Sequence, residues 1–499
     1  MNNGTNNLRF IDIENAIDKP RMEFTREDIV KFILENDIKM VNFRYVGGDG
    51  RLKTLNFVVD GRKHLERILT LGERVDGSSL FKFVDPGTSD LYVVPRYRTA
   101  FVNPVSEIPT VELLCSFFSP DGLPFDGAPE YVLLKAHRRL KEQTGMELEA
   151  LGELEFYVIG PRSDLYPMEV QRGYHASFPF SKFEALRKEA MLAITAAGGK
   201  VKYGHSEVGF VRYGELDLEQ NEIEFLPVPL EDAADQLVLA RWILRAVGYR
   251  HGVNVTFAPK VLVGHAGSGL HIHSRLVKDG FNMIVGRDGL SKVGKKLIGG
   301  YLKFAPSLTA FGNTIPVSYL RLVPHQEAPT SICWGYRNRS ALVRVPLAWS
   351  DTTDMFKVAN PGESGSYSWD VHPQTVEFRA PDGSANVHLL LAGMAVAALN
   401  GLTSEDSLKT AEELFVDKNI FNDPETMKKL PTLPSSCWES AEYLEKHRSF
   451  YEEGNVFTPQ LIDWTIQHLK SFNDRGLSEK LYRKDAEIER LVSKFIHYP

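Results

Sequence analysis

The sequence predicts an α+β protein with a small β-rich N-terminal domain and a larger second domain of helices and strands. Two β-rich runs surround a glycine turn in residues 39–60, and further short strands are expected at 90–94 and 110–117. The segment 119–130 is rich in Pro, Gly and Asp, which is typical of a domain boundary. Beyond it, long helical patterns alternate with short strands, and a chain of 499 residues can bury a large core.

The expected elements follow in chain order. Residues 1–22 are polar and aperiodic, which predicts a flexible N-terminal arm. Thr25 and Asp28 indicate a helix start that opens the first domain, residues 23–120. In the second domain, residues 121–499, helical patterns cover 129–143, 181–197, 229–249, 291–304, 387–400 and several stretches of the last 90 residues. Ser181 and Glu184 predict a capping box for the second of these helices.

Composition excludes several classes of function. A formal net charge of −7 and a pI near 6.1 argue against a general nucleic-acid binder, because no basic excess drives the release of counterions. The three cysteines are scattered, so neither a disulfide framework nor a cysteine zinc site is expected. The N-terminus lacks the pattern of a signal peptide, and the longest apolar run, 389–399, is too short to span a bilayer. We therefore expect a cytoplasmic protein without a membrane partner.

Four predicted strands share one pattern, in which two polar residues of ligand type flank an apolar residue. The pairs are Glu153/Glu155, Glu222/Glu224, His271/His273 and Glu377/Arg379. Side chains two positions apart on a strand point to the same face. A single pair is explained as well by an exposed strand. Four pairs together predict a sheet that is polar on one face and packed on helices on the other.

The composition of these pairs indicates a metal site. Carboxylates on one strand face repel each other unless a cation lies between them, and carboxylates with one or two imidazoles suit Mg²⁺ or Mn²⁺ better than zinc.

The segment 321–346 has the opposite charge. It contains Arg321, Arg337, Arg339 and Arg344 but only one acid, Glu327. Guanidinium groups bind carboxylates and phosphates through paired donors, so the segment is either an anion site or an arginine-rich interface loop. Divalent cations beside several arginines are the combination that holds a nucleotide's phosphates. The sequence therefore predicts an ATP-using enzyme that acts on an anionic substrate. No GxxxxGK[ST] loop is present, so the nucleotide is not held by a P-loop.

Over roughly residues 25–425 the chain resembles the bacterial type I glutamine synthetase family. The matching motifs are VDGSSL (75–80), GELEFY (152–157), HSEV (205–208), QNEIEF (220–225), GSGLHIH (267–273), RLVPHQEAP (321–329), NRSALVRVP (338–346) and VEFRAPDGSAN (376–386). The resemblance implies a β-grasp-like N-terminal domain, a catalytic domain with an antiparallel sheet, and a homo-oligomer, a stacked double ring of twelve. It also implies active sites that lie between neighbouring subunits.

The resemblance also assigns roles to residues. Two or three Mg²⁺ or Mn²⁺ ions per site are implied, with the ligands Glu153, Glu155, Glu207, Glu222, His271 and Glu377. Glutamate would be bound by Gly267, Arg321, Arg339, Arg379 and Tyr174, and ATP by His273 and Arg344. The implied reaction is phosphorylation of the γ-carboxylate of glutamate by ATP, followed by attack of an amine on the acyl phosphate. Arg339 would stabilise the transferred phosphate and Glu327 would take a proton from the amine.

Ammonia, giving glutamine, is the leading acceptor, with a substituted amine or a polyamine as the alternative. The alternative rests on a departure from the family: an Asp that helps to bind ammonium is replaced by Gly47, and Asp49 lies two residues away. A second departure is an insertion between Glu207 and Glu222, so Glu215 or Glu219 competes for a metal role. About twenty further residues are inserted around 350–370.

Two other classes of function stay open at this stage. A phosphagen-type kinase would stop at phosphoryl transfer and would not need all six metal-ligand matches. A catalytically silent relative would be expected to have lost metal glutamates, which this chain keeps.

Overall fold

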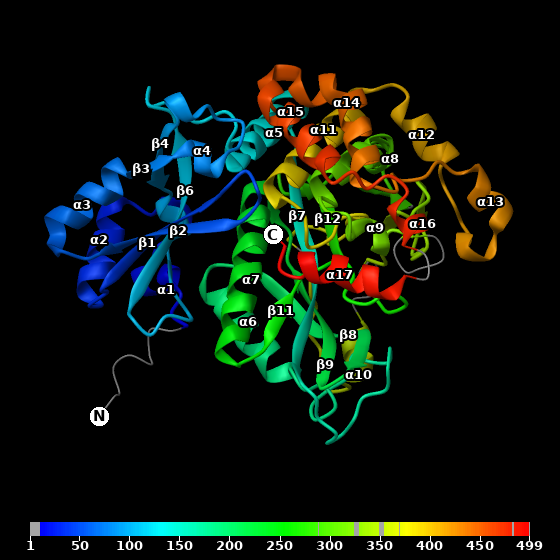
Figure 1. Ribbon diagram of the computed structural model, residues 1–499, viewed down its shortest axis with the longest axis horizontal. Coiled ribbons are helices and arrows are strands. Elements are labelled where there is room, and N and C mark those ends of the chain that lie inside the picture. The colour runs from blue at the N-terminus through cyan, green and yellow to red at the C-terminus, as the bar shows by residue number, and fades with distance from the viewer. Residues whose placement is uncertain are drawn as a thin grey trace.

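The computed structural model describes residues 10–287, 289–323, 329–348, 354–368, 370–481 and 484–498. A small domain, coloured blue to cyan in Figure 1, lies beside a larger domain that contains the rest of the chain. Each has its own hydrophobic cluster of buried residues. The expected α+β architecture is confirmed.

The small domain is a six-stranded mixed sheet with two longer helices and shorter helical segments. Its strand order is β2-β1-β6-β4-β3, with β5 pairing β6, and β1 runs parallel to β6. The strands are β1 (Met40–Val46), β2 (Leu52–Val58), β3 (Glu73–Asp76), β4 (Asp90–Pro95), β5 (Phe101–Val102) and β6 (Thr110–Phe118). The two helices are α2 (Arg26–Glu35) and α3 (Gly61–Leu71), and a short α4 (Gly77–Leu80) follows β3. The hairpin expected around the glycine turn is therefore present as β1 and β2.

The start of the small domain differs in part from expectation. The capping box at Thr25 and Asp28 is confirmed. Residues 10–22 of the expected flexible arm are ordered, because α1 (Ile13–Ile17) and a turn at Arg21–Glu23 pack on the domain. Ile13 is fully buried in the domain's core, an apolar contact that the polar surroundings of this residue in the sequence did not reveal.

The large domain is built on a ten-stranded sheet. Its main strand order is β16-β17-β18-β12-β7-β9-β8, and every pairing is antiparallel except that of β16 with β17. The strands are β7 (Glu147–Pro161), β8 (Val201–Tyr213), β9 (Leu216–Phe225), β12 (Leu270–Lys278), β16 (Trp334–Tyr336), β17 (Val343–Val345) and β18 (Val376–Phe378), with β10 (Val228–Pro229), β11 (Asn254–Thr256) and β13 (Phe281–Asn282) at its margins. A separate pair is formed by β14 (Val285–Gly286) and β15 (Gly289–Leu290).

Long helices cover one face of this sheet. They are α5 (Pro129–Thr144), α6 (Glu184–Ala196), α7 (Leu230–Arg250), α8 (Lys292–Gly312) and α11 (Val387–Thr403), close to the expected ranges. The capping box predicted for α6 is wrong. Its N-cap is Phe183, because the hydroxyl of Ser181 donates to Glu219 instead (2.7 Å) and Glu184 accepts from the backbone N–H of Phe178 (2.6 Å).

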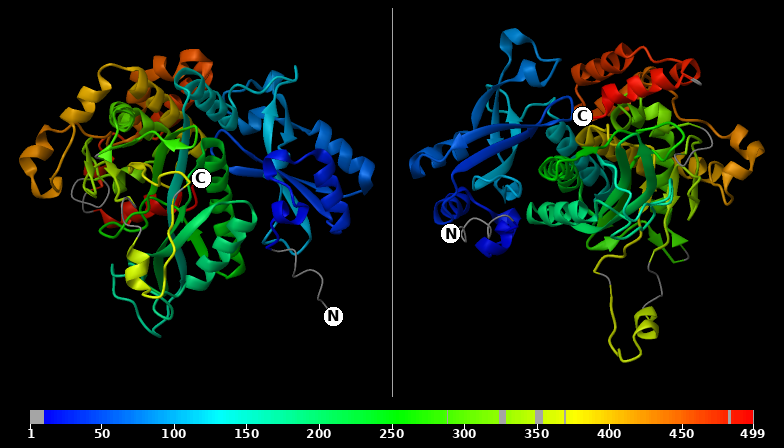
Figure 2. Two further views of the ribbon diagram at one scale, coloured as in Figure 1. Left: turned by 180° about the vertical axis from the view of Figure 1, so that it is seen from behind. Right: turned by 60° about the horizontal axis from the view of Figure 1, so that its bottom comes forward.

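The remaining helices surround this core. They are α9 (Ser318–Arg321), α10 (Met355–Ala359), α12 (Ser407–Glu413), α13 (Pro424–Lys429), α14 (Cys437–Glu452), α15 (Pro459–Ser471), α16 (Leu477–Lys480) and α17 (Asp485–Phe495). The last helix packs on Ile315, Val317 and Leu320. The inserted segment that carries α10 projects from the domain, as the right-hand view of Figure 2 shows. Among the described helices, none alone is long and apolar enough to cross a membrane, and one pair, α11 with α12, passes that test only with a bend of 101°.

Candidate active site

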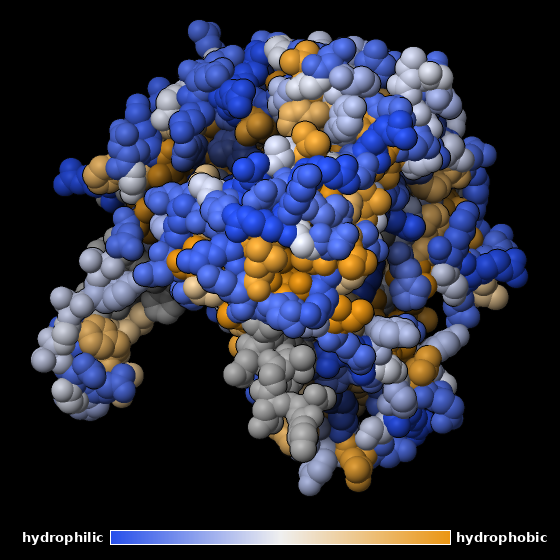
Figure 3. Space-filling model, turned by 90° about the vertical axis from the view of Figure 1, so that its left-hand side faces the viewer, coloured by the Kyte–Doolittle hydropathy of each residue, from blue (hydrophilic) through white to orange (hydrophobic). Residues whose placement is uncertain are grey.

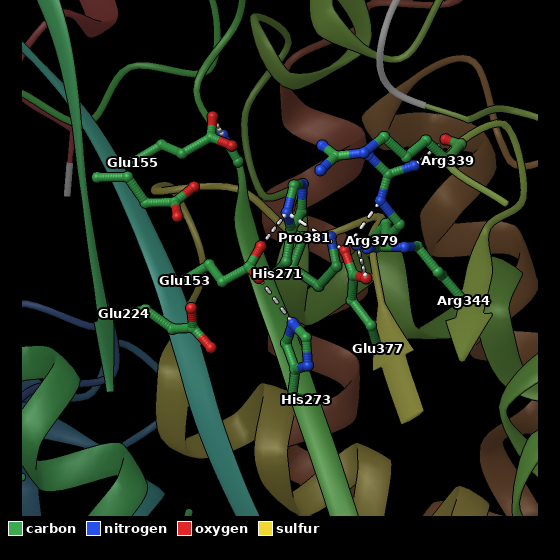
Figure 4. Close-up of polar contacts among 12 residues, drawn as sticks. Glu153, Glu155, Glu224, His271, His273, Arg339, Arg344, Glu377, Arg379 and Pro381 are labelled. Atoms are coloured by element: carbon green, nitrogen blue, oxygen red, sulfur yellow. Dashed lines mark hydrogen bonds and ion pairs between the residues drawn. The ribbon is translucent and has the colours of Figure 1, made fainter. Parts of the chain in front are cut away.

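The four polar pairs of the sequence lie on one face of the large sheet and on adjacent strands. The register places Glu153 opposite Glu224 and His271, Glu155 opposite Glu222, and His273 opposite Glu377. Figure 4 shows the side chains of Glu153, Glu155, Glu224, His271, His273 and Glu377 in one region of this face. The apolar residues between them, Leu154, Ile223, Ile272 and Phe378, are fully buried against the helices. The predicted division into a polar and a helix-packed face is confirmed.

One group of metal-ligand atoms is centred on Glu153. Its carboxylate accepts from His271 Nδ1 and from His273 Nε2, both at 2.9 Å. Single ligand atoms of Glu153, His273 and Glu377 lie within 4.8 Å of one another, the spacing that one metal ion requires. His271 Nδ1 lies 3.7 Å from Glu377 Oε1. Both imidazoles of the GSGLHIH motif therefore point at this group, whereas the sequence assigned only His271 to the metal.

The electrostatics of this group are those of a charged carboxylate between imidazoles. Burial alone would raise the pKa of Glu153, but His273 and His271 hold it well below its usual range. Burial likewise opposes protonation of His273, yet the nearby carboxylates of Glu153 and Glu377 raise its pKa. A proton on His273 offsets negative charge here, which is the role that a divalent cation takes when it is bound.

A second group of ligand atoms lies at the other end of the same face. It consists of His205, Glu207 and Glu222, whose ligand atoms also lie within 4.8 Å of one another. Burial raises the pKa of Glu222 well above its usual range, and the carboxylates of Glu153, Glu155, Glu207 and Glu224 raise it further. So many carboxylates around Glu222 fit a divalent cation, and the donor set of carboxylates with imidazole suits Mn²⁺ or Mg²⁺.

His205 was not assigned a role by the sequence, although it stands in the HSEV motif. His205 lies opposite Glu222, and this position makes it a candidate ligand. The sequence alone does not show it, because it depends on how β8 pairs with β9. Its Nε2 lies 3.2 Å from Glu222 Oε1. Burial lowers the pKa of His205, so the ring is neutral and has a nitrogen lone pair available for a metal.

The competition among Glu215, Glu219 and Glu222 is resolved by the fold. Glu215 is exposed in the turn between β8 and β9. Glu219 is buried, but it accepts from the hydroxyl of Ser181 and from the N–H of Lys182, which begin the approach to α6. Of the three, Glu222 is the one that faces Glu155 and lies near Glu207, so it remains the candidate ligand.

Glu155 is held between two backbone segments. Its carboxylate accepts from the N–H of Gly269 (2.7 Å) and from Gln220 Nε2 (3.2 Å), and Gln220 also donates to the carbonyl of Gly267 (2.9 Å). A Cβ at Gly267 would lie 2.6 Å from the carbonyl oxygen of Pro259, so this close approach requires glycine there. The glycine loop and the carboxylate are thus parts of one arrangement.

Arginines form the opposite margin of the polar face. Glu377 accepts from Arg344 (2.7 Å) and from Arg379 Nε (3.0 Å), and Arg379 also donates to the backbone carbonyl of Arg339. Arg321 is buried, donates to the carbonyl of Ala380 (2.8 Å) and lies 3.3 Å from His271 Nε2. In Figure 4, Arg339, Arg344 and Arg379 lie together beside Glu377. The structure therefore brings together Arg321, Arg339, Arg344 and Arg379, the arginines that the family resemblance assigned to glutamate and ATP, whereas Arg337 of the same segment is exposed.

Two further candidates have different outcomes. Glu327, the proposed proton acceptor, lies outside the described residues. Tyr174 lies at the margin of the second metal group, where its ring contacts that of His205 with 5.5 Å between centroids. Asp49, which the sequence offered as a substitute for the missing Asp, is already engaged, because it forms an ion pair with Lys53 Nζ (3.0 Å) and accepts from the N–H of Arg51 (3.1 Å).

The arrangement places an acidic and a basic half side by side on one rigid sheet. The acidic half can hold divalent cations, and the basic half can hold an anion through guanidinium groups. An arrangement of this kind neutralises a polyphosphate and stabilises negative charge that develops during phosphoryl transfer.

Comparisons with known proteins match both domains to one family. Residues 37–120 match the family described as glutamine synthetase, beta-Grasp domain, and residues 126–472 match glutamine synthetase, catalytic domain. A glutamine synthetase of Aquifex aeolicus is 29% identical over 96% of this chain and 98% of its own length. A protein of Cupriavidus pinatubonensis named 3-hydroxylaminophenol mutase is 30% identical over 88% of this chain and 94% of its own.

A solved structure of Plasmodium falciparum glutamine synthetase has the same fold. It superposes with a TM-score of 0.72 at 20% identity and covers 93% of this chain and 97% of that one. The two matched domains together span most of the chain, in the order seen in the structure. The chain therefore belongs to the glutamine synthetase family and is an enzyme of the ATP-dependent carboxylate-amine ligase type.

Proposed function

We propose that this enzyme joins an amine to the γ-carboxylate of glutamate at the expense of ATP, through a γ-glutamyl phosphate. The observation that carries the proposal is the direct contact between the two halves of the site. Glu377, one of the metal-ligand group, is bonded on both of its oxygens by Arg344 and Arg379. A phosphate held by a metal ion and a carboxylate held by the arginines would therefore be adjacent, as transfer of a phosphoryl group to glutamate requires.

Divalent cations bound by the two ligand groups would supply charge neutralisation of the ATP phosphates and of the transferred group. The residues of the chain supply the rest. Arg321, Arg339 and Arg379 bind the γ-carboxylate and stabilise the phosphate that it receives, and Gly267 approaches the amino-acid backbone. His273 and Arg344 lie on the nucleotide side.

The chemistry balances in two steps. An oxygen of the γ-carboxylate attacks the γ-phosphorus of ATP, and ADP leaves. The nitrogen of the amine then attacks the acyl carbon, a proton passes from the nitrogen to Glu327, and phosphate leaves with the original carboxylate oxygen. Ammonia and a substituted amine are both competent in the second step. The two acceptors differ only in the groups attached to the nitrogen. One relative is named 3-hydroxylaminophenol mutase, so not every similar protein is named a glutamine synthetase.

A homo-oligomer, expected as a double ring of twelve, and a cytoplasmic location complete the proposal. Self-association is supported by exposed apolar side chains on the small domain, such as Val58 (65% exposed) and Leu71 (64%). Figure 3, which looks at the molecule from the side of this domain, shows hydrophobic residues gathered within a mostly hydrophilic surface. Apolar groups gathered in this way mark contact surfaces.

The decisive test labels glutamate with ¹⁸O in its γ-carboxylate and supplies ATP, Mg²⁺ and a panel of amines. We expect ADP, a γ-glutamyl amide identified by mass, and one ¹⁸O atom in the released phosphate. ADP without label in the phosphate would exclude the acyl phosphate. A phosphorylated product that accumulates without any amide would indicate a kinase of the phosphagen type instead.

A further inference from the structure

Four ring side chains line the margin of the acidic half of the site. Tyr174 stacks on His175 with ring centroids 4.2 Å apart, His175 lies 4.4 Å from His205, and Tyr203 lies 5.8 Å from His205. We call these four residues the aromatic wall. Tyr174 is 54% exposed and Tyr203 is 44% exposed. Ring faces of this size are therefore accessible from solvent beside carboxylates that are buried.

The fold holds the aromatic wall in place. Tyr203 and His205 belong to β8, whereas Tyr174 and His175 belong to the loop between β7 and α6. That loop is tied to β8 by backbone hydrogen bonds from Gly173 to the carbonyl of Val208 (3.1 Å) and from His175 to the carbonyl of Ser206 (2.9 Å). The second bond forms with His175 in the left-handed region (φ 57°), a conformation that the surrounding contacts must maintain.

The wall is in register with the acidic cluster. Tyr203 stands opposite Glu224, and His205 stands opposite Glu222, on neighbouring strands. Residues directly opposite each other in an antiparallel pair point to the same face of the sheet. Each of these two rings therefore borders one buried carboxylate, and the space between wall and carboxylates is lined by π faces on one side and by negative charge on the other.

This combination of groups selects organic cations. Ring faces attract a positive charge, and they also bury the carbon atoms attached to it. The chain contains an example of such an interaction in the same place. The ammonium of Lys202 is paired with Glu224 at 2.7 Å and lies 5.0 Å from the centroid of the Tyr203 ring. An alkylammonium thus already fits between a ring of the wall and a carboxylate of the cluster.

The chain offers fewer groups that would bind free ammonium. Ammonium has no carbon surface, so its recognition depends on anionic and oxygen donors that replace its water. Gly47 supplies no side chain, and Asp49 is paired with Lys53 and bonded to the backbone of Arg51. Asp49 would have to leave its ion pair with Lys53 to compensate for the missing Asp.

We propose that the acceptor of this enzyme is a substituted ammonium, whose nitrogen lies beside Glu207 and Glu222 and whose carbon substituent lies against the aromatic wall. The inference rests on the proposed function, because it names the amine of that reaction. Tyr174 and Tyr203 are then the residues that determine specificity, through contact with the substituent.

The test measures kcat/KM for ammonium, methylamine, ethylamine, ethanolamine, putrescine and phenethylamine, with saturating glutamate and Mg²⁺-ATP. We expect a carbon-bearing amine to exceed ammonium by about tenfold or more, the effect of about 1.4 kcal/mol. Tyr203→Ala should raise KM for the preferred amine about tenfold, leave KM for glutamate and ATP unchanged, and affect ammonium turnover little. Tyr174→Ala should also raise KM for the preferred amine about tenfold. Tyr174→Phe, which keeps the ring, should retain the preference.

Tyr213→Ala is the matched control, because Tyr213 is a similarly exposed tyrosine (48%) on the same strand, at the turn before β9. It should leave the amine preference unchanged. Ammonium as the best acceptor, or wall variants that slow ammonium and the substituted amines equally, would overturn this inference and leave the proposed function intact. Failure of every acceptor to yield ADP and an amide would overturn the proposed function and the inference together.

Discussion

Glu155 on β7 and Glu222 on β9 stand directly opposite each other on the polar face of the sheet. Both are buried, and Glu207 and Glu224 add further negative charge around Glu222. Like charges directly opposite each other destabilise a sheet. The metal-free protein is therefore strained at this point, and the strain is what a bound cation relieves.

Glu222→Gln tests this balance through stability. Without metal, the variant should melt at a temperature equal to or about 2 °C above that of the wild type, because one repelling charge is gone. Adding Mn²⁺ should raise the melting temperature of the wild type and leave that of the variant nearly unchanged. Glu215→Gln, at the exposed turn, is the control and should respond to Mn²⁺ as the wild type does. An equal Mn²⁺ response in the Glu222 variant would remove Glu222 from the metal site.

Glu155→Ala and His271→Ala test the two ligand groups through activity. Each should keep the fold, because the polar face loses repulsion together with a ligand, and each should reduce ADP formation by about a hundredfold or more. Circular dichroism checks the first expectation and a coupled ADP assay the second. Near-native ADP formation by either variant would be incompatible with its assignment as a metal ligand.

The junction of the two domains contains a buried ion network that sequence motifs did not indicate. Asp235 on α7 accepts from Arg96 (2.8 and 3.1 Å) and lies 3.2 Å from His388 Nε2. Asp235→Ala should lower the free energy of unfolding by about 3 kcal/mol, because it leaves a buried guanidinium unpaired. Thermal or urea denaturation measures this loss.

Asp232 provides the matched control for that variant. It lies one turn earlier on the same helix and pairs with Arg98, also of the small domain, but its side chain is 40% exposed. Asp232→Ala should cost less than about 1 kcal/mol, since water screens this pair. Equal losses from the two variants would show that burial of the Arg96 pair does not control the junction.

His447 makes a testable contribution to acid sensitivity. Burial, with Lys446 and Lys303 nearby, lowers the pKa of His447 to about 4, from an unfolded value near 6.5. Above pH 6.5 the ring is neutral in both states and has no effect. Between pH 6.5 and 4, His447 is protonated in the unfolded chain but stays neutral in the folded protein. The free energy of unfolding therefore falls as the pH falls. His447→Gln should reduce this loss by about 1 kcal/mol, because solvent screens part of the effect.

The measurement is the free energy of urea unfolding of the wild type and of His447→Gln, each at pH 7 and at pH 4.5. The variant should lose less stability than the wild type between the two, even if it is less stable at pH 7 through loss of the bond to Ser307 (2.9 Å). Identical losses would show that His447 titrates normally in the folded protein.

The expected assembly is tested by sedimentation. Active enzyme should sediment as a species far larger than a dimer of the 56.2 kDa chain, because exposed apolar residues such as Val58 and Leu71 favour self-association and the family resemblance implies sites shared between subunits. Activity should be measured across the same fractions. A fully active monomer would contradict the expectation.

The sequence by itself determined the elements and the faces of the strands. Alternation along a strand is a local property, so Glu153/Glu155 and His271/His273 were assigned to one polar face before any neighbour was known. The glycine turn of the first hairpin and the helix cap at Thr25 are likewise determined by a few neighbouring residues. The candidate metal and arginine residues were likewise named from short motifs, through the family resemblance that those motifs carry.

Only the tertiary structure decided which of these residues meet. His205 became a ligand candidate through its position opposite Glu222, and Glu219 was excluded because Ser181, far away in the chain, binds it. That bond also removed the predicted cap of α6. Strand order and register arise from packing of the whole domain, since hydrogen bonds and buried contacts between distant segments have no local sequence signal.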